Sequence, residues 1–282
     1  MKPAPGLHPD IPAPDYHAWE AVSQSRLWTM RKSSPAHAFY ALTHPMEATP
    51  AMLLGQAVHC AVLEPGRFGR EYIRAIDGDG RTAAVKAARA AQSAENPAAT
   101  LLTSTDFDKC LAIREACAGN KFARMLLDGD HESSFVWADP DTGLLCKGRS
   151  DVLGFKTGSV VDLKTTRSAA RNQFERSLYQ YGYHVQAAHY LAGVRACGID
   201  IKSGEEGGGF VIIAVEPFPP YAIQVFRLLD PVVGWGEEER RKLLEKWAAC
   251  EASGIWPGYP DDIQDLSLPP WATREIEEVI SE

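Results

Sequence analysis

The segment 159–165, Ser-Val-Val-Asp-Leu-Lys-Thr, carries two charged residues inside an otherwise apolar, β-branched run. Successive side chains of a strand point to opposite faces, so Asp162 and Lys164 share one face of the predicted strand, and Val161 and Leu163 the other. Charged groups are costly to bury unless they pair or bind a metal. The segment therefore predicts either a buried strand with a polar site on one face, or an exposed edge strand with a surface ion pair.

Two further strands are predicted immediately before this segment. They cover residues 133–138 and 144–153 and are joined by turn-forming residues, and a second short turn leads into 159–165. Asp151 and Asp162 thus lie in adjacent strands. Two neighbouring carboxylates repel each other unless a divalent cation lies between them, and oxygen ligands suit Mg²⁺ or Mn²⁺. This pairing favours a metal site over the edge strand, with a nearby lysine that can orient or deprotonate a water molecule.

The rest of the chain alternates between predicted helices and strands, which indicates an α/β fold with a central mixed sheet of about five strands. We expect one domain over residues 1–282, with an irregular, proline-rich N-terminal arm (1–22) and an acidic C-terminal extension (230–282). Helices are predicted over residues 23–34, 52–63, 81–95, 104–118, 173–197 and 236–250, and further strands over 210–215 and 222–228.

Composition excludes several classes of protein. Hydrophobic residues make up 45% and charged residues 23%, which is typical of a globular chain and not of a disordered or collagen-like one. The six cysteines are scattered without a Cys-x-x-Cys pair, so we expect reduced thiols and a cytoplasmic location. No apolar run approaches the roughly 18 residues of a membrane span, and the first twenty residues lack the apolar core of a signal peptide.

The formal net charge of −8 is unevenly distributed along the chain. Residues 230–282 contain 13 acidic and 5 basic groups, which accounts for the whole excess. Residues 147–176, around the predicted site, contain 7 basic and 3 acidic groups. Because local charge matters more than net charge at physiological salt, the composition does not exclude a nucleic-acid partner.

A series of short motifs, each weak alone, occurs in a characteristic order. They are Ser23–Leu27, Ser34–Pro35, Leu54–His59, Leu63–Pro65, Lys147–Asp151, Asp162–Thr166 and Tyr183–Tyr190. Together they resemble the PD-(D/E)XK nuclease superfamily, and specifically its RecE-type branch of exodeoxyribonuclease VIII-like phage recombination exonucleases. The resemblance covers roughly residues 23–228 and implies a restriction-endonuclease-like fold, with a central mixed sheet flanked by helices.

The resemblance also implies a metal centre. It suggests one or two Mg²⁺ ions, for which Mn²⁺ can substitute, and a water molecule activated or oriented by Lys164. The implied ligands are His59, Asp151, Asp162, the backbone carbonyl of Leu163 and, as an additional acidic ligand, Glu132. From the residues alone, a packed histidine on an apolar helix is the favoured reading of His59, which the resemblance reverses, and Glu132 reads equally as a turn-capping glutamate.

Two further sets of residues complete the predicted site. Gln186 and Tyr190 lie four residues apart on one helix face and match the family's Q-x-x-x-Y element, which positions substrate near the metals; the alternative is the wet face of an amphipathic helix. The candidate DNA-binding residues are Arg26, Lys147, Arg149, Arg167 and Arg171, each of which reads equally as a solvated charge.

The sequence departs from the family pattern at Ser150, where a proline usually precedes the first acidic residue. Only Cys250 lies beyond position 200, so we expect no iron–sulfur cluster of the kind found in RecB-like relatives. The glycines at 207–209 are not followed by Lys-Ser/Thr, so we expect no P-loop and no use of ATP.

The function that the resemblance implies is magnesium-dependent exonucleolytic digestion of linear duplex DNA. It implies 5′-to-3′ digestion, 3′ single-stranded overhangs for recombination, a homo-oligomeric ring of three or four subunits, and a single-strand annealing protein as partner. Two alternatives stay open: a structure-dependent or nicking endonuclease with the same site, and a DNA-end-binding protein with a vestigial nuclease site. Intact Asp151, Asp162 and Lys164 favour an enzyme.

Overall fold

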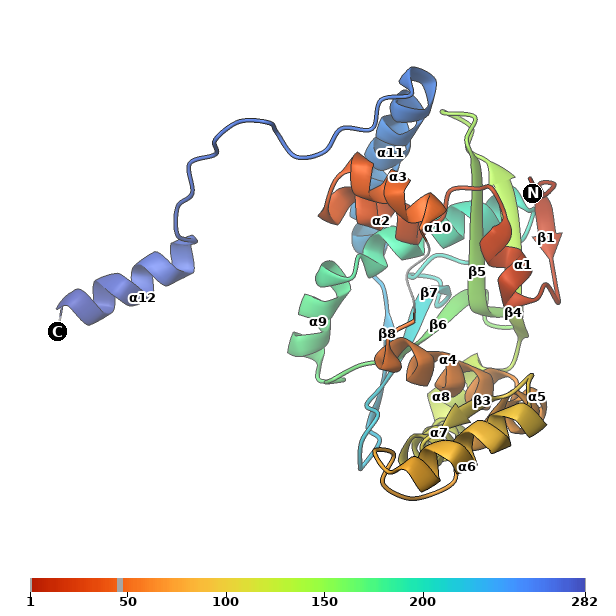
Figure 1. The fold of residues 1–282 in the computed structure, drawn as a ribbon. Helices are drawn as coiled ribbons and strands as arrows, with labels where there is room; N and C mark the ends of the chain where they lie inside the picture. The colour runs from red at the N-terminus through yellow and green to blue at the C-terminus, as the bar shows by residue number, and fades with distance from the viewer. Residues whose placement is uncertain (1, 45–47, 282) are drawn as a thin grey trace.

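A six-stranded sheet runs through the centre of the protein (Figure 1). The computed structural model describes residues 2–44 and 48–281; residues 1, 45–47 and 282 of the predicted domain span lie outside the described residues. The strand order is β1-β4-β5-β6-β7-β8, in which only β6 and β7 pair in parallel. The strands are β1 (Gly6–His8), β4 (Asp130–Ala138), β5 (Leu145–Gly154), β6 (Ser159–Thr165), β7 (Gly209–Val215) and β8 (Ile223–Arg227).

Helices flank this sheet, which confirms the predicted α/β fold class with a mixed central sheet. A separate parallel pair, β2 (Tyr72–Arg74) and β3 (Thr100–Leu102), lies among the helices that precede β4. The helices are α1 (Ala13–Ala18), α2 (Gln24–Lys32), α3 (Pro35–Thr43), α4 (Pro50–Leu63), α5 (Pro65–Glu71), α6 (Ala83–Glu95), α7 (Ser104–Gly119), α8 (Lys121–Leu126), α9 (Arg171–Gln180), α10 (Tyr183–Ala196), α11 (Asp230–Ser253) and α12 (Pro270–Ser281).

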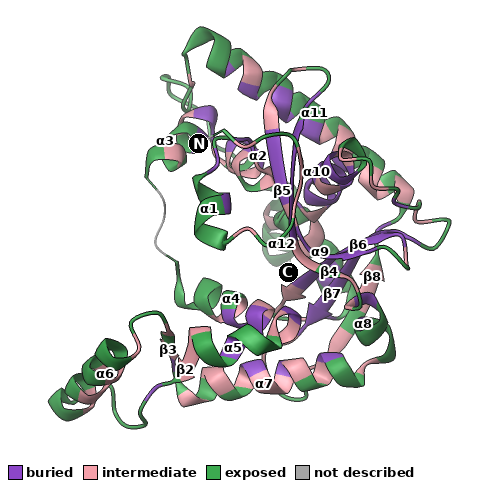
Figure 2. Cartoon of the chain, turned by 90° about the vertical axis from the view of Figure 1, so that its right-hand side faces the viewer, coloured by how far each residue is buried: buried purple, intermediate pink, exposed green. Residues whose placement is uncertain are grey.

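The alternation of side chains along β6 and β7 divides the interior into two apolar cores. Val161 and Leu163 pack in one core, with residues of α4 and α7. Val160 and Ile212 pack in the other, with residues of α2, α10 and α11. Figure 2 shows β6 and β7 buried and the outer faces of the surrounding helices exposed. Consequently Asp162, in register with Val160, faces the side of the sheet covered by α10.

The N-terminal arm is ordered, and the prediction of an irregular segment is wrong. Gly6–His8 forms the edge strand β1 and pairs antiparallel with β4, which raises the sheet from about five strands to six. Lys147 Nζ donates to the carbonyl oxygens of Tyr16 at 2.7 Å and Trp19 at 3.0 Å. A lysine on an inner strand thus fixes the arm, a contact between residues about 130 positions apart that local sequence cannot reveal.

The helix predicted over residues 173–197 is also wrong as a single element. It is broken into α9 and α10 at Gly182, which has φ +69°. A Cβ atom at this position would lie 2.4 Å from the Trp28 ring. Both the left-handed backbone and the close approach of the indole require glycine here.

The acidic C-terminal extension consists of two unlike parts. In α11, Leu244 and Trp247 are almost fully buried against the core next to α10. By contrast, α12 has no buried residue and stands away from the body of the protein at the end of an extended segment (Figure 1). Among residues 2–44 and 48–281, none of the helices combines the length and apolar character needed to cross a bilayer.

Candidate active site

The strands β5 and β6 separate at the predicted site. Their ladder ends at the Val152–Val161 pair, one residue before Asp151 and Asp162. Beyond that point, the Leu163 N–H donates to Asp151 Oδ2 at 2.6 Å. The Asp151 carboxylate thus replaces a backbone acceptor where the strands diverge.

Three potential ligands converge at this point. Glu132 lies on β4 opposite Asp151, between the paired positions His131–Val152 and Ser133–Ser150, and has φ +50°. His59 reaches the same point from α4, with Nδ1 3.5 Å from Asp151 Oδ1. His59, Glu132 and Asp151 each offer one ligand atom, and these atoms all lie within 4.8 Å of one another. We call these three residues the ligand cluster.

The protonation behaviour of the ligand cluster shows unbalanced charge. Burial and the neighbouring Asp151 raise the pKa of Glu132 to about 7. Burial would lower the pKa of His59, but Asp151 outweighs it and raises that pKa to about 9. Burial would raise the pKa of Asp151, but His59, Lys164 and the Leu163 N–H hold it below its usual value. In the metal-free protein, protons therefore balance charge that a cation can balance instead.

The ligand cluster fits a divalent cation by its donor chemistry. Two carboxylates and one imidazole are donors that Mn²⁺ and related ions accept readily, and the carboxylates also suit Mg²⁺. Three protein ligands leave coordination positions for water or a substrate oxygen. The donor set thus supports a divalent-metal centre.

A second group of residues lies next to the ligand cluster and is already neutralised within the protein. Lys164 Nζ lies 2.6 Å from Asp162 Oδ2, and Gln186 Nε2 donates to Asp162 Oδ1 at 2.7 Å. We call Asp162 and Lys164 the lysine pair. The Asp162 side chain is 3% exposed and that of Lys164 21%, so the alternative of an exposed edge strand is wrong.

In the lysine pair, the pKa values of both members are raised. Burial would lower the pKa of Lys164, but Asp162 outweighs it and raises that pKa above the usual value. Burial and the Asp151 charge raise the pKa of Asp162 against the opposing effect of Lys164. Lys164 is therefore an ammonium group at neutral pH, which suits orienting a water or stabilising a negative charge better than abstracting a proton.

Two tyrosines of α10 complete this region. Burial raises the pKa of Tyr190 and Gln186 partly offsets this rise, and the Tyr190 ring meets Phe135 edge-on at 5.5 Å. Lys164 Nζ lies 5.0 Å from the centroid of the Tyr183 ring. Tyr183 was not among the predicted site residues, although it lies three positions before Gln186 and so on the same helix face.

The five candidate DNA-binding residues occupy different environments. Lys147 is buried beneath the arm, and burial lowers its pKa to about 8. Arg149 donates to the Ile11 carbonyl at 2.7 Å and to Ser134 Oγ at 2.8 Å. In this conformation both side chains hold the arm. Arg167 and Arg171 are exposed near the start of α9, and Arg171 pairs with Glu175 at 3.0 Å.

The fifth, Arg26, donates to the Ala21 carbonyl at 2.7 Å and lines an open pocket. The pocket has a volume of about 1100 Å³ and lies between the arm, α2 and α4. Gln56, one turn of α4 before His59, lines it as well. The pocket thus opens beside the element that carries His59.

Comparisons with known proteins agree with this architecture. No curated protein matches the chain. A solved structure from Eubacterium rectale, described as a "putative exonuclease", is similar with a TM-score of 0.63 over 94% of this chain and 98% of that chain. Its sequence identity is 13%, so the likeness concerns the fold. Residues 22–268 match the family described as a PDDEXK-like domain of unknown function (DUF3799), and the chain belongs to that family.

Proposed function

We propose that the protein is a metal-dependent exodeoxyribonuclease that hydrolyses phosphodiester bonds of linear duplex DNA. The observation that carries the proposal is the ligand cluster, which lies where β5 and β6 diverge and is next to the lysine pair. Family membership and the shared fold support a nuclease. We propose one nuclease domain, with Mg²⁺ as the natural ion and Mn²⁺ as a substitute.

In this proposal, each residue of the site has a defined role. His59, Glu132 and Asp151 would hold the cation, with Asp162 and the Leu163 backbone carbonyl as further candidate ligands. When bound, the cation polarises the scissile phosphate and supplies an activated water. Lys164, held as an ammonium by Asp162, orients that water and stabilises charge developing on the phosphate. Gln186 fixes the Asp162 carboxylate, and Tyr190 fixes Gln186.

The DNA-binding residues divide by their environments. Arg26 in the open pocket, and Arg167 and Arg171 near the start of α9, are accessible for phosphate contacts. An arginine fork binds phosphate oxygens bidentately, which suits a 5′-phosphate pocket. Lys147 and Arg149 contribute by holding the arm along the edge of the sheet.

The finer assignment rests on the resemblance to RecE-type exonucleases. We propose 5′-to-3′ digestion that leaves 3′ overhangs for phage-type recombination, a ring of three or four subunits, and a single-strand annealing protein as partner. Light scattering checks the ring, because a strict monomer at micromolar concentration would exclude it.

End-labelled linear duplex and a covalently closed circle of the same sequence test the proposed function together. With Mg²⁺, we expect label to leave the 5′ end of the linear DNA first while the circle stays intact. Cutting of the circle at a similar rate would indicate the endonuclease alternative. DNA-end binding without cleavage would indicate a vestigial site.

A further inference from the structure

A row of aromatic rings runs from the core to the surface beside the lysine pair. Phe226 stacks on the buried Phe174 at 4.7 Å between ring centroids, and Phe174 stacks on Tyr183 at 6.0 Å. Tyr183 stacks in turn on Tyr181 at 5.7 Å, with 29° between the ring planes. Tyr181 is 53% exposed, so the outer end of the row is open to solvent.

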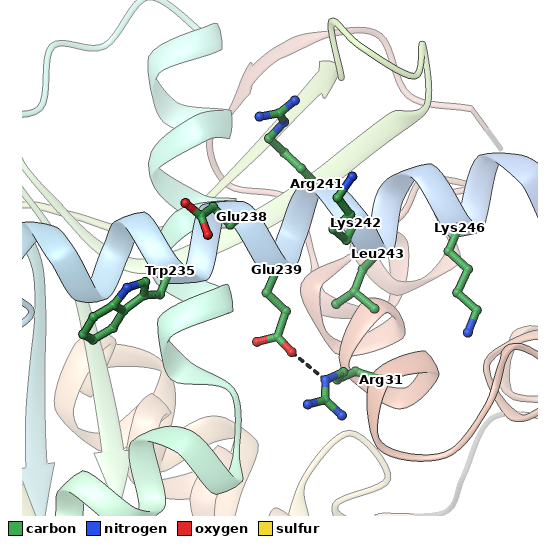
Figure 3. Close-up of a pocket in the computed structure, with 8 residues that line it drawn as sticks. All are labelled: Arg31, Trp235, Glu238, Glu239, Arg241, Lys242, Leu243 and Lys246. Atoms are coloured by element: carbon green, nitrogen blue, oxygen red, sulfur yellow. Dashed lines mark hydrogen bonds and ion pairs between the residues drawn. The ribbon is translucent and has the colours of Figure 1, made fainter.

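The turn that carries Tyr181 is fixed on both sides. Gly182 is packed against Trp28, and the next residue, Tyr183, lies beneath the ammonium of Lys164. His184 Nε2 lies 2.9 Å from Glu239 Oε2. Arg31 pairs with the same glutamate (Figure 3). Helices α2, α10 and α11 therefore meet at this turn, and the Tyr181 ring projects from it into solvent.

An exposed aromatic ring next to the proposed nuclease site can bind a nucleobase by stacking. Bases of an intact duplex stack on one another, whereas an unpaired base can stack on a protein aromatic ring. Lys32, whose Nζ lies 5.4 Å from the Trp28 ring centroid, adds positive charge at the same turn. An aromatic ring that stacks on a base and a nearby cation that attracts the phosphate backbone together favour binding of single-stranded DNA.

We propose that Tyr181 stacks on an unpaired nucleobase of the strand whose phosphodiester lies at the lysine pair. The proposal rests on the proposed nuclease function and adds to it a single-stranded segment at the site, with Tyr183 as the support of the stacking ring. The row of rings then aligns that strand relative to Lys164.

The test measures binding of the full-length protein to fluorescein-labelled dA12 in EDTA, which prevents metal-dependent cleavage. A set of oligonucleotides, each with one abasic position, locates any stacked base. We expect the abasic site at one position to weaken wild-type binding about tenfold. Y181A should weaken binding to intact dA12 by a similar factor and remove the sensitivity at that position. Y181F and Y181W should retain both.

The exposed Tyr259 provides the matched control, since Y259A removes a tyrosine that is 68% exposed and contacts His37 instead of the row. Binding of Y181A equal to wild type, or a persistent abasic effect in Y181A, would overturn the stacking proposal. A parallel assay of linear duplex with Mg²⁺ separates the two ideas: if the wild type still digests duplex, the nuclease proposal survives. If the wild type neither binds dA12 nor cleaves DNA, both proposals are wrong.

Discussion

The ligand cluster and the lysine pair are neighbours whose carboxylates have different partners. In the ligand cluster, burial and the Asp151 charge raise the pKa of Glu132 to about 7, and Asp151 raises the pKa of His59 to about 9 against the effect of burial. In the lysine pair, Asp162 forms an ion pair with Lys164 and accepts a hydrogen bond from Gln186. We propose on this basis that the ligand cluster takes up the added cation and that Lys164 supplies a positive charge beside it.

The largest effect should follow from removing the ammonium of the lysine pair. K164M keeps most of the apolar stem but should lower the cleavage rate at least about a hundredfold. It also leaves the Asp162 carboxylate buried without its cation, which costs up to about 3–5 kcal/mol of unfolding free energy. Single-turnover cleavage and urea unfolding measure the two effects. K121M, at an exposed lysine, is the control, and cleavage by K164M within tenfold of wild type would contradict the role of Lys164.

Metal affinity should distinguish the two groups directly. D151N removes charge from the ligand cluster and should weaken Mg²⁺ binding more than tenfold, whereas D162N should weaken it less because Lys164 already neutralises that carboxylate. Calorimetric titration of both variants measures the difference. Equal losses would show that the two groups form one metal site, and unchanged binding in both would remove the proposed centre.

The stability and the Mg²⁺ affinity of the ligand cluster should both depend on pH. Raised pKa values mean that the metal-free fold favours the protonated forms of His59 and Glu132. Their stabilisation is present at low pH and is lost as pH rises, through about 7 for Glu132 and about 9 for His59. Mg²⁺ competes with these protons, so its affinity should rise over the same range. Calorimetric Mg²⁺ titrations at several pH values measure this rise in affinity. In E132Q, the part of the rise near pH 7 should be absent.

The smallest effect should come from Gln186, which contacts Asp162 and not the ligand cluster. Q186A removes one hydrogen bond to a buried carboxylate, which costs about 1.5–3 kcal/mol of stability. Metal affinity should stay near the wild-type value, and cleavage should fall about tenfold as Asp162 loses its orientation. Calorimetry measures the metal affinity of Q186A, and cleavage assays measure its rate. A loss of metal affinity as large as that of D151N would contradict the separation of the ligand cluster from the lysine pair.

Much of the central sheet could be predicted because its determinants are local. The alternation of Asp162 and Lys164 with Val161 and Leu163 specified which side chains face which side of β6. The same pattern did not specify that Lys164 is largely buried, since burial depends on α10, which is supplied by residues 20 positions further along the chain.

Other features depend on contacts between distant segments. Lys147 was a candidate for phosphate binding because its own strand places it near Asp151, but the arm occupies its ammonium group. The break at Gly182 follows from the indole of Trp28, more than 150 residues away. Convergence of Glu132 with His59 required the β4–β5 register and the position of α4 together.

The most direct test of the central claim is the Mg²⁺ dependence of linear-duplex digestion by wild type and D151N. We predict digestion by wild type with Mg²⁺, none in EDTA, recovery when Mg²⁺ is restored, and at least a hundredfold loss in D151N at the same Mg²⁺ concentration. Wild-type digestion that persists in EDTA, or D151N digestion at the wild-type rate, would contradict a metal-dependent nuclease site at the ligand cluster.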